Sequence, residues 1–301
     1  MQLTFLGTAG SWPTRERSAS AIALDMEQEV VLLDCGEGTQ RQFFQSPVSF
    51  MRVRRIFLSH FHGDHFLGVP GLIQSMCLNN RTEPLDIYGP RETRKFVDMM
   101  LNLGHFTLKF QVSAHELAPG DEVDLNTYTV RTARAKHSVP TIAVRVEEKM
   151  KRGRFDGEKA RGMGIRGRDF ARLEAGENVT VANGSVVTPQ MVMGPARAGR
   201  SVVYSGDSAP EGDIVRLAKG ADILIHESTA AKELEKDMND WGHSTARQAA
   251  GVAVEAQVGT LFLTHFSARY PDPSPLEEEA RASFAGARAA RDLLSELVRQ
   301  R

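Results

Sequence analysis

Short apolar runs, separated by glycine, proline and polar residues, dominate the first part of the chain. Runs of this length and spacing are typical of buried strands. We expect strands at 3–6, 20–24, 30–34, 56–59, 85–88 and 127–133. Apolar residues at helical spacing predict one helix that ends near Leu78 and a second helix over 91–101.

After Val181, apolar strand-like runs alternate with helical patterns. Strands are predicted at 201–205, 223–227 and 260–264, and helices at 211–219 and 245–257. The stretch Ser274-Pro275-Leu276-Glu277 has the form of a capping box with proline at the first helical position, so we expect a helical C-terminus. Alternation of this kind indicates an α/β protein.

The overall composition is that of a globular protein, with 41% hydrophobic and 25% charged residues among 301. The formal net charge is −1, so the overall charge indicates neither a nucleic-acid nor a membrane partner. We expect the two cysteines, Cys35 and Cys77, to be small buried side chains in a reducing cytoplasm. Neither a signal peptide nor a membrane-spanning run is expected.

One segment departs from this composition. Between Lys149 and Arg172 there are nine Lys or Arg and three Asp or Glu, a net charge of +6, with five glycines interleaved. Its few apolar residues show no period, so we do not expect a core element there. The segment predicts a mobile, exposed, basic arm that grips phosphates, and the alternative is a solvated loop with an accidental charge bias.

The six residues His60-Phe61-His62-Gly63-Asp64-His65 place three imidazoles and one carboxylate directly after a predicted strand. A helix with Pro70 in its first turn is expected next, so this turn lies at the carboxyl end of the strand, where open α/β sheets bind ligands. Imidazole and carboxylate are ligands that Zn²⁺ prefers. One tetrahedral ion cannot take all four and still hold a water, so two ions fit better. The alternative is a chance histidine cluster on a solvated turn.

Other predicted strands end in similar side chains, namely His137, Asp207 and His265. Because strand ends at one edge of a sheet lie close in space, we expect these residues to join the histidine-rich turn. A carboxylate such as Asp207 can bridge two ions, since each of its oxygens can bind one. Two ions about 3.5–4 Å apart suit the hydrolysis of a phosphodiester.

Six short motifs mark the chain from end to end: Thr4-Phe5-Leu6-Gly7-Thr8, the HFHGDH turn at 60–65, Lys136-His137-Ser138, Ser205-Gly206-Asp207-Ser208, Gly242-His243-Ser244-Thr245 and His265-Phe266-Ser267-Ala268-Arg269-Tyr270. The motifs occur in the order seen in the ribonuclease Z branch of the metallo-β-lactamase superfamily, which the chain resembles over nearly its whole length. The HFHGDH turn is specific only to the superfamily, whereas the last two motifs point to the branch. The chain departs from the family at Gly164–Phe170, where arginines replace a proline-rich motif.

The resemblance implies an αββα metallo-β-lactamase-type sandwich, a single domain over residues 1–301 with the flexible basic arm inserted at about 147–200. It also implies two Zn²⁺ ions per subunit. One ion would bind His60, His62, His137 and Asp207, and the other would bind Asp64, His65, Asp207 and His265.

The same resemblance assigns roles to further side chains. Asp64 would accept a proton from the attacking water, and His243 would protonate the leaving 3′ oxygen; the alternative for His243 is a capping neighbour of Ser244. His226 and Glu227 would orient the metal ligands, and the alternative for this pair is plain packing.

The implied activity is that of a zinc-dependent endoribonuclease, which removes 3′ trailers from precursor tRNA and leaves a tRNA 3′-hydroxyl and a trailer 5′-phosphate. Arg166, Arg168 and Arg172 of the arm would help clamp the tRNA elbow of a substrate held by the partner subunit of a homodimer. Two other functions stay open at this point. One is a two-zinc hydrolase of small phosphodiesters or other esters without a tRNA role, and the other is a non-catalytic RNA-binding protein with a decayed site.

Overall fold

The computed structural model describes residues 1–300, and the chain divides into two compact units. Unit 1 contains Met1–Glu147 and the chain from Arg200 onwards. Unit 2 is Glu148–Gly199, which covers the segment for which the inserted arm is predicted.

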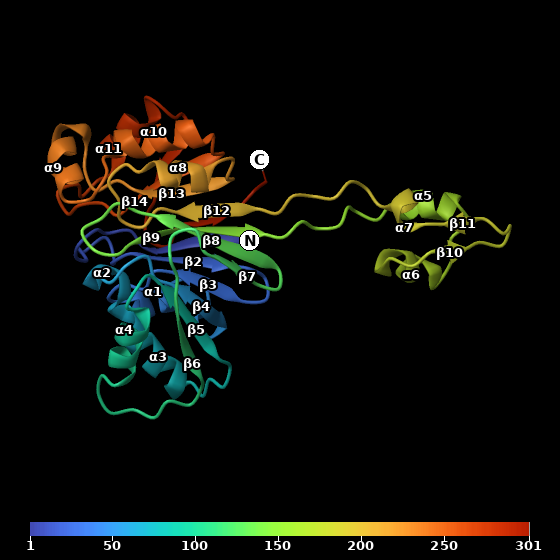
Figure 1. Ribbon diagram of the computed structural model, residues 1–301, viewed down its shortest axis with the longest axis horizontal. Helices are drawn as coiled ribbons and strands as arrows, with labels where there is room; N and C mark the ends of the chain where they lie inside the picture. Colours follow the sequence, from blue (N-terminus) through green and yellow to red (C-terminus); the bar gives the residue numbers. More distant parts are fainter. Residues whose placement is uncertain (301) are drawn as a thin grey trace. The chain divides into compact units, whose positions relative to one another are not determined.

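Two seven-stranded sheets form the centre of unit 1 (Figure 1). The first sheet contains, in spatial order, β16 (Ser295–Leu297), β1 (Gln2–Gly7), β2 (Ala21–Asp25), β3 (Val30–Leu33), β4 (Val53–Phe57), β5 (Leu85–Gly89) and β6 (Val112–Glu116). Strands β3 to β6 are parallel to one another, while β2 pairs antiparallel with β3, and β1 pairs antiparallel with β2 and β16. The sheet is therefore mixed.

The second sheet is also mixed. Its spatial order is β15 (Ala287–Ala289), β14 (Thr260–Thr264), β13 (Ile223–Glu227), β12 (Ser201–Tyr204), β9 (Ile142–Glu148), β8 (Tyr128–Arg134) and β7 (Glu122–Asp124). Strands β12 to β15 are parallel, and β9 pairs antiparallel with β12. The parallel register brings the carboxyl ends of β12, β13 and β14 to the same edge of the sheet.

Helices cover the outer face of each sheet, and the inner faces pack against each other (Figure 1). The first sheet carries α1 (Thr39–Gln45), α3 (Gly68–Leu78) and α4 (Thr93–Leu101); the second carries α8 (Gly212–Ala218), α10 (Ala246–Ala256) and α11 (Ser274–Arg281). Successive strand residues point to opposite faces. In β13, for example, Ile223 and Ile225 join the core between the sheets, and Leu224 joins the core under the helices. Where both faces are buried, as in β3 and β14, the strand is a continuous apolar run.

The shorter helical elements of unit 1 lie in its connections. They are η1 (Phe50–Arg52), α2 (Gly63–Phe66), η2 (Lys232–Leu234) and α9 (Glu235–Asp240). Cys35 and Cys77 are both buried and free, as predicted. Within residues 1–300, no helix combines the length and the hydrophobicity that crossing a membrane requires.

Unit 2 has a small core of its own, so the expectation that no core element forms there is wrong. It contains α5 (Gly157–Gly162), α6 (Asp169–Ala175), a hairpin of β10 (Val179–Thr180) and β11 (Val186–Val187), and α7 (Pro189–Val192). Its buried side chains are Ala160, Ile165, Leu173, Val179, Val187 and Val192. Leu173 and the three valines lie beyond Arg172, outside the basic segment, so the composition of that segment alone did not reveal this packing.

The expected helical C-terminus is also wrong beyond Arg281. Helix α11 begins at Ser274 with Pro275 in its first turn, but the Ser274 hydroxyl donates to Asp272 Oδ1 and makes no capping box. The chain then forms β15 and β16, which extend the two sheets at their edges. Strands of three residues are too short to show a hydrophobic period, which explains why the sequence pattern missed them.

Candidate active site

The predicted metal-binding side chains meet at one end of the two sheets. His60 follows β4, His137 follows β8, Asp207 follows β12 and His265 follows β14, while His62, Asp64 and His65 lie in or next to α2. Seven residues from four segments of the chain thus form two adjoining groups of possible metal ligands, one of which contains Asp207; a third group joins Asp207 and His265 to His243.

The first group contains His60, His62, His137 and Asp207. His62 Nδ1 lies 3.1 Å from His60 Nε2 and 3.1 Å from His137 Nε2. Asp207 Oδ2 is 3.7 Å from His60 Nε2 and 4.0 Å from His137 Nε2. Four ligand atoms from three separate connections therefore surround one small volume.

The second group contains Asp64, His65 and His265. Asp64 Oδ2 is 3.4 Å from His65 Nε2 and 3.3 Å from His265 Nε2, and it accepts a hydrogen bond of 2.7 Å from the Ser11 backbone N–H. Asp207 Oδ2 lies 3.4 Å from His65 Nε2 and 3.2 Å from His265 Nε2. Asp207 is therefore in reach of both groups.

This geometry fits divalent metal ions. Zinc–nitrogen bonds of about 2.0–2.1 Å in a tetrahedron place the ligand atoms roughly 3.3–3.4 Å apart, close to the spacings found in both groups. Two buried polar atoms of the cluster, His65 Nε2 and Asp207 Oδ1, have no hydrogen-bond partner. Buried polar atoms are rarely left unpaired, and a metal ion would satisfy both.

The protonation states also suit metal binding, which requires neutral imidazole and ionised carboxylate. Burial lowers the pKa of His60 and of His137, so their lone pairs are available. Burial raises the pKa of Asp207, but the neighbouring His265 and His65 outweigh it and hold that pKa well below its usual range. His65 differs, since three carboxylates outweigh burial and raise its pKa well above the usual range. A metal cation could take the place of that proton.

Asp34 orients His65 and was not identified from the sequence. Its Oδ2 accepts from His65 Nδ1 at 2.7 Å and from the Tyr204 hydroxyl at 2.7 Å, and it is fully buried. The Ser59 backbone N–H donates to Oδ1 at 2.6 Å. An aspartate at the end of a strand, before a glycine-rich turn, is too common a pattern to single out without the fold.

Two other histidines are held through their Nδ1 atoms. His137 Nδ1 donates to the Gly242 carbonyl at 2.8 Å, and a Cβ at Gly242, whose φ is +80°, would lie 2.8 Å from the same nitrogen. His265 Nδ1 lies 2.9 Å from Thr229 Oγ1. Contacts of this kind fix the ring orientation and leave Nε2 to face a metal ion.

His243 lies beside the cluster and is held by Glu227. Its Nδ1 is 2.9 Å from Glu227 Oε1 and 3.9 Å from Asp207 Oδ2. Burial lowers the pKa of His243, but the charge and hydrogen bond of Glu227 outweigh it and raise the pKa to about 9. Glu227 Oε2 also accepts from the Thr229 hydroxyl at 2.8 Å, so one buried carboxylate reaches His243 directly and His265 through Thr229.

His226 is placed differently from Glu227. Its Nδ1 bonds the Glu227 backbone carbonyl at 2.7 Å, and its Nε2 has no partner. No hydrogen bond or ion pair within residues 1–300 joins it to the clustered ligands.

The three predicted arm arginines lie in unit 2. Arg166 and Arg168 are exposed, and neither has an ion-pair partner among residues 1–300. Arg172 instead pairs with Asp169 at 3.1 Å and with Glu177 at 3.0 Å.

Comparisons with known proteins agree with this arrangement. A family model described as a beta-lactamase superfamily domain matches residues 29–266. The chain is 43% identical to ribonuclease Z of Methanosarcina acetivorans, covering 98% of this chain and 97% of the relative. It is 45% identical to ribonuclease Z of Methanothermobacter thermautotrophicus, covering 98% and 96%. The crystal structure of the short form of human tRNase Z matches with a TM-score of 0.73 at 28% identity, covering 99% of this chain and 100% of that chain.

Identities above 40% over nearly the full length of both sequences, joined to the superfamily match, show the family. The chain belongs to the ribonuclease Z family of the metallo-β-lactamase superfamily.

Proposed function

We propose that this chain is a zinc-dependent endoribonuclease that removes 3′ trailers from precursor tRNA. The products would be a tRNA with a 3′-hydroxyl and a trailer with a 5′-phosphate. The observation that carries the proposal is the double group of histidines and aspartates around Asp207, in a chain of the ribonuclease Z family.

Two zinc ions per subunit would be held by the two groups, with Asp207 shared between them. When bound, such ions acidify a water and neutralise the negative charge of a phosphodiester. The position of Asp207 Oδ2 supports sharing, because it lies 3.7 Å from His60 Nε2 in the first group and 3.2 Å from His265 Nε2 in the second.

Asp64 would take up the proton of the attacking water. Burial raises its pKa, but His65 and His265 outweigh burial, so the pKa is lowered and the carboxylate is ionised at neutral pH. The Ser11 N–H and His265 Nε2 both contact Oδ2, which fixes the carboxylate at the edge of the cluster.

His243 would protonate the leaving 3′ oxygen of the tRNA. Glu227 occupies Nδ1, which leaves Nε2 as the ring nitrogen available to substrate. A pKa of about 9 keeps the imidazole protonated near neutrality, and a general acid must hold its proton until the leaving oxygen needs it.

Unit 2 would be a flexible arm that binds tRNA phosphates. The arginines best placed for this are Arg166 and Arg168, because they are exposed and have no ion-pair partner among residues 1–300. Phosphate binding by such side chains is electrostatic and therefore weakens with salt. Homodimerisation and a cytoplasmic location are expected from the family alone and stay predictions.

Arg172 provides a matched control for the arm. Replacing Arg166 and Arg168 with Gln is expected to raise KM for precursor tRNA and to flatten its salt dependence. Arg172→Gln should have a smaller effect, since that guanidinium is already paired. Hydrolysis of bis(p-nitrophenyl) phosphate should change less than cleavage of precursor tRNA. An equal loss on both substrates would contradict a role of the arm in binding.

The activity itself is tested by mapping the cut on one 3′-extended precursor tRNA, with and without a chelator. We expect one cut after the discriminator nucleotide, a 3′-hydroxyl on the tRNA and loss of cleavage on chelation. Cleavage only of small phosphodiesters would instead support the hydrolase without a tRNA role. An RNA complex without any cleavage would support the non-catalytic alternative.

A further inference from the structure

A cleft of about 630 Å³ adjoins the metal-binding cluster on the side of His137. Residues 134–142, which link β8 to β9, line one side of it, and the turns after β5 and β6 line the other. His137 belongs both to the cluster and to the cleft lining, so a molecule in the cleft would reach the metal ligands directly.

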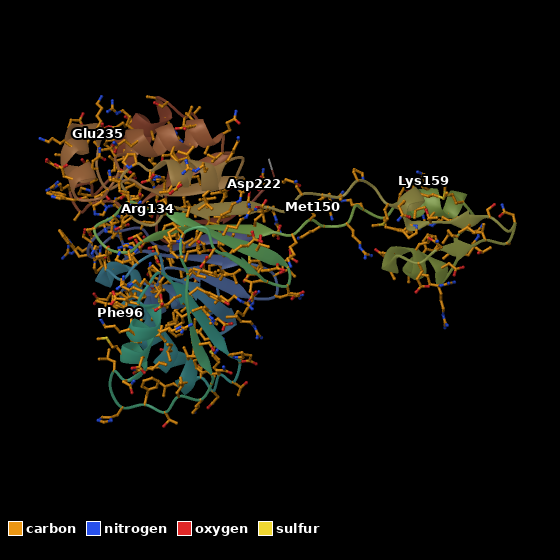
Figure 2. All side chains as sticks on the ribbon, in the orientation of Figure 1. Phe96, Arg134, Met150, Lys159, Asp222 and Glu235 are labelled. Carbon is orange, nitrogen blue, oxygen red and sulfur yellow. The ribbon has the colours of Figure 1, made fainter. Side chains whose placement is uncertain are left out.

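The cleft carries three cations that have no ion-pair partner within residues 1–300. They are Arg91, Arg134 and Lys136, and all three are exposed. Arg134, labelled in Figure 2, is the last residue of β8. Exposed cations that no carboxylate neutralises are the usual partners of phosphate in nucleic-acid sites.

The carboxylates of the cleft are already engaged. Glu116 Oε1 accepts from the Glu92 backbone N–H at 3.0 Å, and Asp121 Oδ2 accepts from the Ala118 backbone N–H at 2.8 Å. Three cations against these two anions leave the lining net positive. An anionic ligand is therefore favoured over a cationic one.

Apolar side chains complete the lining. Leu117, Val139 and Pro140 face the same space as the cations. Pockets of this volume, mostly apolar with a few polar groups, suit small organic ligands. A charged phosphate next to an apolar base is the chemistry of a nucleotide.

The position of His243 decides which nucleotide the cleft takes. Its ring centroid lies 4.9 Å from that of His137, and the Gly242 carbonyl accepts from His137. The group assigned to protonate the leaving oxygen thus lies against His137, which itself lines the cleft. A nucleotide bound in the cleft would therefore lie near the group that meets the leaving 3′ oxygen.

We infer that this cleft binds the 3′-terminal nucleotide of the tRNA itself, with Arg134 and Lys136 contacting the phosphate on its 5′ side. The inference rests on the proposed function, because it uses the role of His243 in releasing the 3′ oxygen. The binding energy of this nucleotide would position the scissile phosphate over the cluster.

The test places a single neutral methylphosphonate in precursor tRNA at one of two linkages. The first is the linkage on the 5′ side of the 3′-terminal tRNA nucleotide, and the second is the linkage after the first trailer nucleotide. Each substrate is cleaved by wild type and by Arg134→Gln, and kcat/KM is compared. Arg131→Gln is the matched control, since Arg131 is an exposed arginine of the same strand that pairs with Glu147 and does not line this cleft.

Arg134→Gln is expected to lower kcat/KM about tenfold on the unmodified precursor, the size of one charge-assisted contact. On the first modified substrate, kcat/KM of the variant should be less than about twofold below that of wild type, because the charge that Arg134 would bind is already gone. On the second it should still lose about tenfold. Arg131→Gln should match wild type on all three.

If the effect of Arg134→Gln on kcat/KM disappeared with the neutral trailer linkage instead, or persisted with both neutral linkages, the inference would be overturned. The proposed function would stay intact. Failure of the wild type to cleave the unmodified precursor would overturn both. Thermal melting of Arg134→Gln separates a folding defect from lost contact, and Lys136→Gln repeats the test with a second cation of the cleft. If Lys136→Gln lowered kcat/KM equally on the unmodified precursor and on the precursor with the first linkage neutral, that result would likewise count against the assigned phosphate contact.

Discussion

Replacing Asp34 with Asn should weaken metal binding without changing any metal ligand. The carboxylate is fully buried and takes part in four hydrogen bonds. Oδ2 accepts from His65, Tyr204 and the Ser59 hydroxyl at 2.7, 2.7 and 2.8 Å, and Oδ1 accepts from the Ser59 N–H at 2.6 Å. An amide has only one accepting oxygen, so its NH₂ group must face at least one of these donors.

The size of the effect follows from these contacts. The less costly orientation of the amide keeps its oxygen near His65 and leaves the Ser59 N–H unpaired, which costs roughly 1–3 kcal/mol of folding free energy. His65 then loses its anionic partner, and loss of such an orienting contact typically costs about 10–100-fold in metal affinity. We expect zinc affinity, measured by competition with a chromophoric chelator, to fall by that factor.

Asp222→Asn is the matched control. Asp222, labelled in Figure 2, is also buried, and its Oδ2 accepts from the Ser201 N–H at 2.7 Å and the Ser201 hydroxyl at 3.1 Å. It lies at the start of β13, at the opposite end of the strand from the cluster. This variant should lose folding stability but keep its zinc affinity. Equal zinc affinity in wild type and Asp34→Asn, or an equal decrease in both variants, would refute the reasoning.

Three further outcomes follow from the geometry. His243→Ala should lower kcat on precursor tRNA by about 10²–10⁴-fold but slow bis(p-nitrophenyl) phosphate much less, because a phenolate leaves without a proton; equal losses would remove His243 from acid catalysis. Gly242→Ala should destabilise the protein and weaken zinc binding, since its Cβ would lie 2.8 Å from His137 Nδ1 at a φ of +80°; unchanged chelator competition would contradict this. Gly251→Ala, inside α10 with open space around its Cβ, should raise the free energy of unfolding in urea by about 0.5–1 kcal/mol, and a decrease would contradict the helix-propensity argument.

Two of the strands that carry the cluster, β12 and β14, could be predicted from the sequence because burial on both faces makes them continuous apolar runs. The predicted limits of the strands at 223–227 and 260–264 coincide with β13 and β14. Histidine and aspartate directly after such strands are uncommon enough to identify, and the structure brings all seven predicted metal-binding residues together.

What the sequence could not provide depends on contacts between distant segments. Asp34 orients His65 across 31 positions, and the backbone carbonyl of Gly242 orients His137 across 105. Neither pairing has a local pattern. The core of unit 2 was missed for a similar reason, because Ala160 and Ile165 pack with residues beyond the basic segment.

A crystal of the zinc-loaded protein, with anomalous diffraction recorded at the zinc absorption edge, tests the metal centre most directly. We expect two peaks per subunit about 3.5–4 Å apart, one among His60, His62 and His137 and the other among Asp64, His65 and His265, with Asp207 between them. A single peak, or peaks away from these side chains, would contradict this expectation.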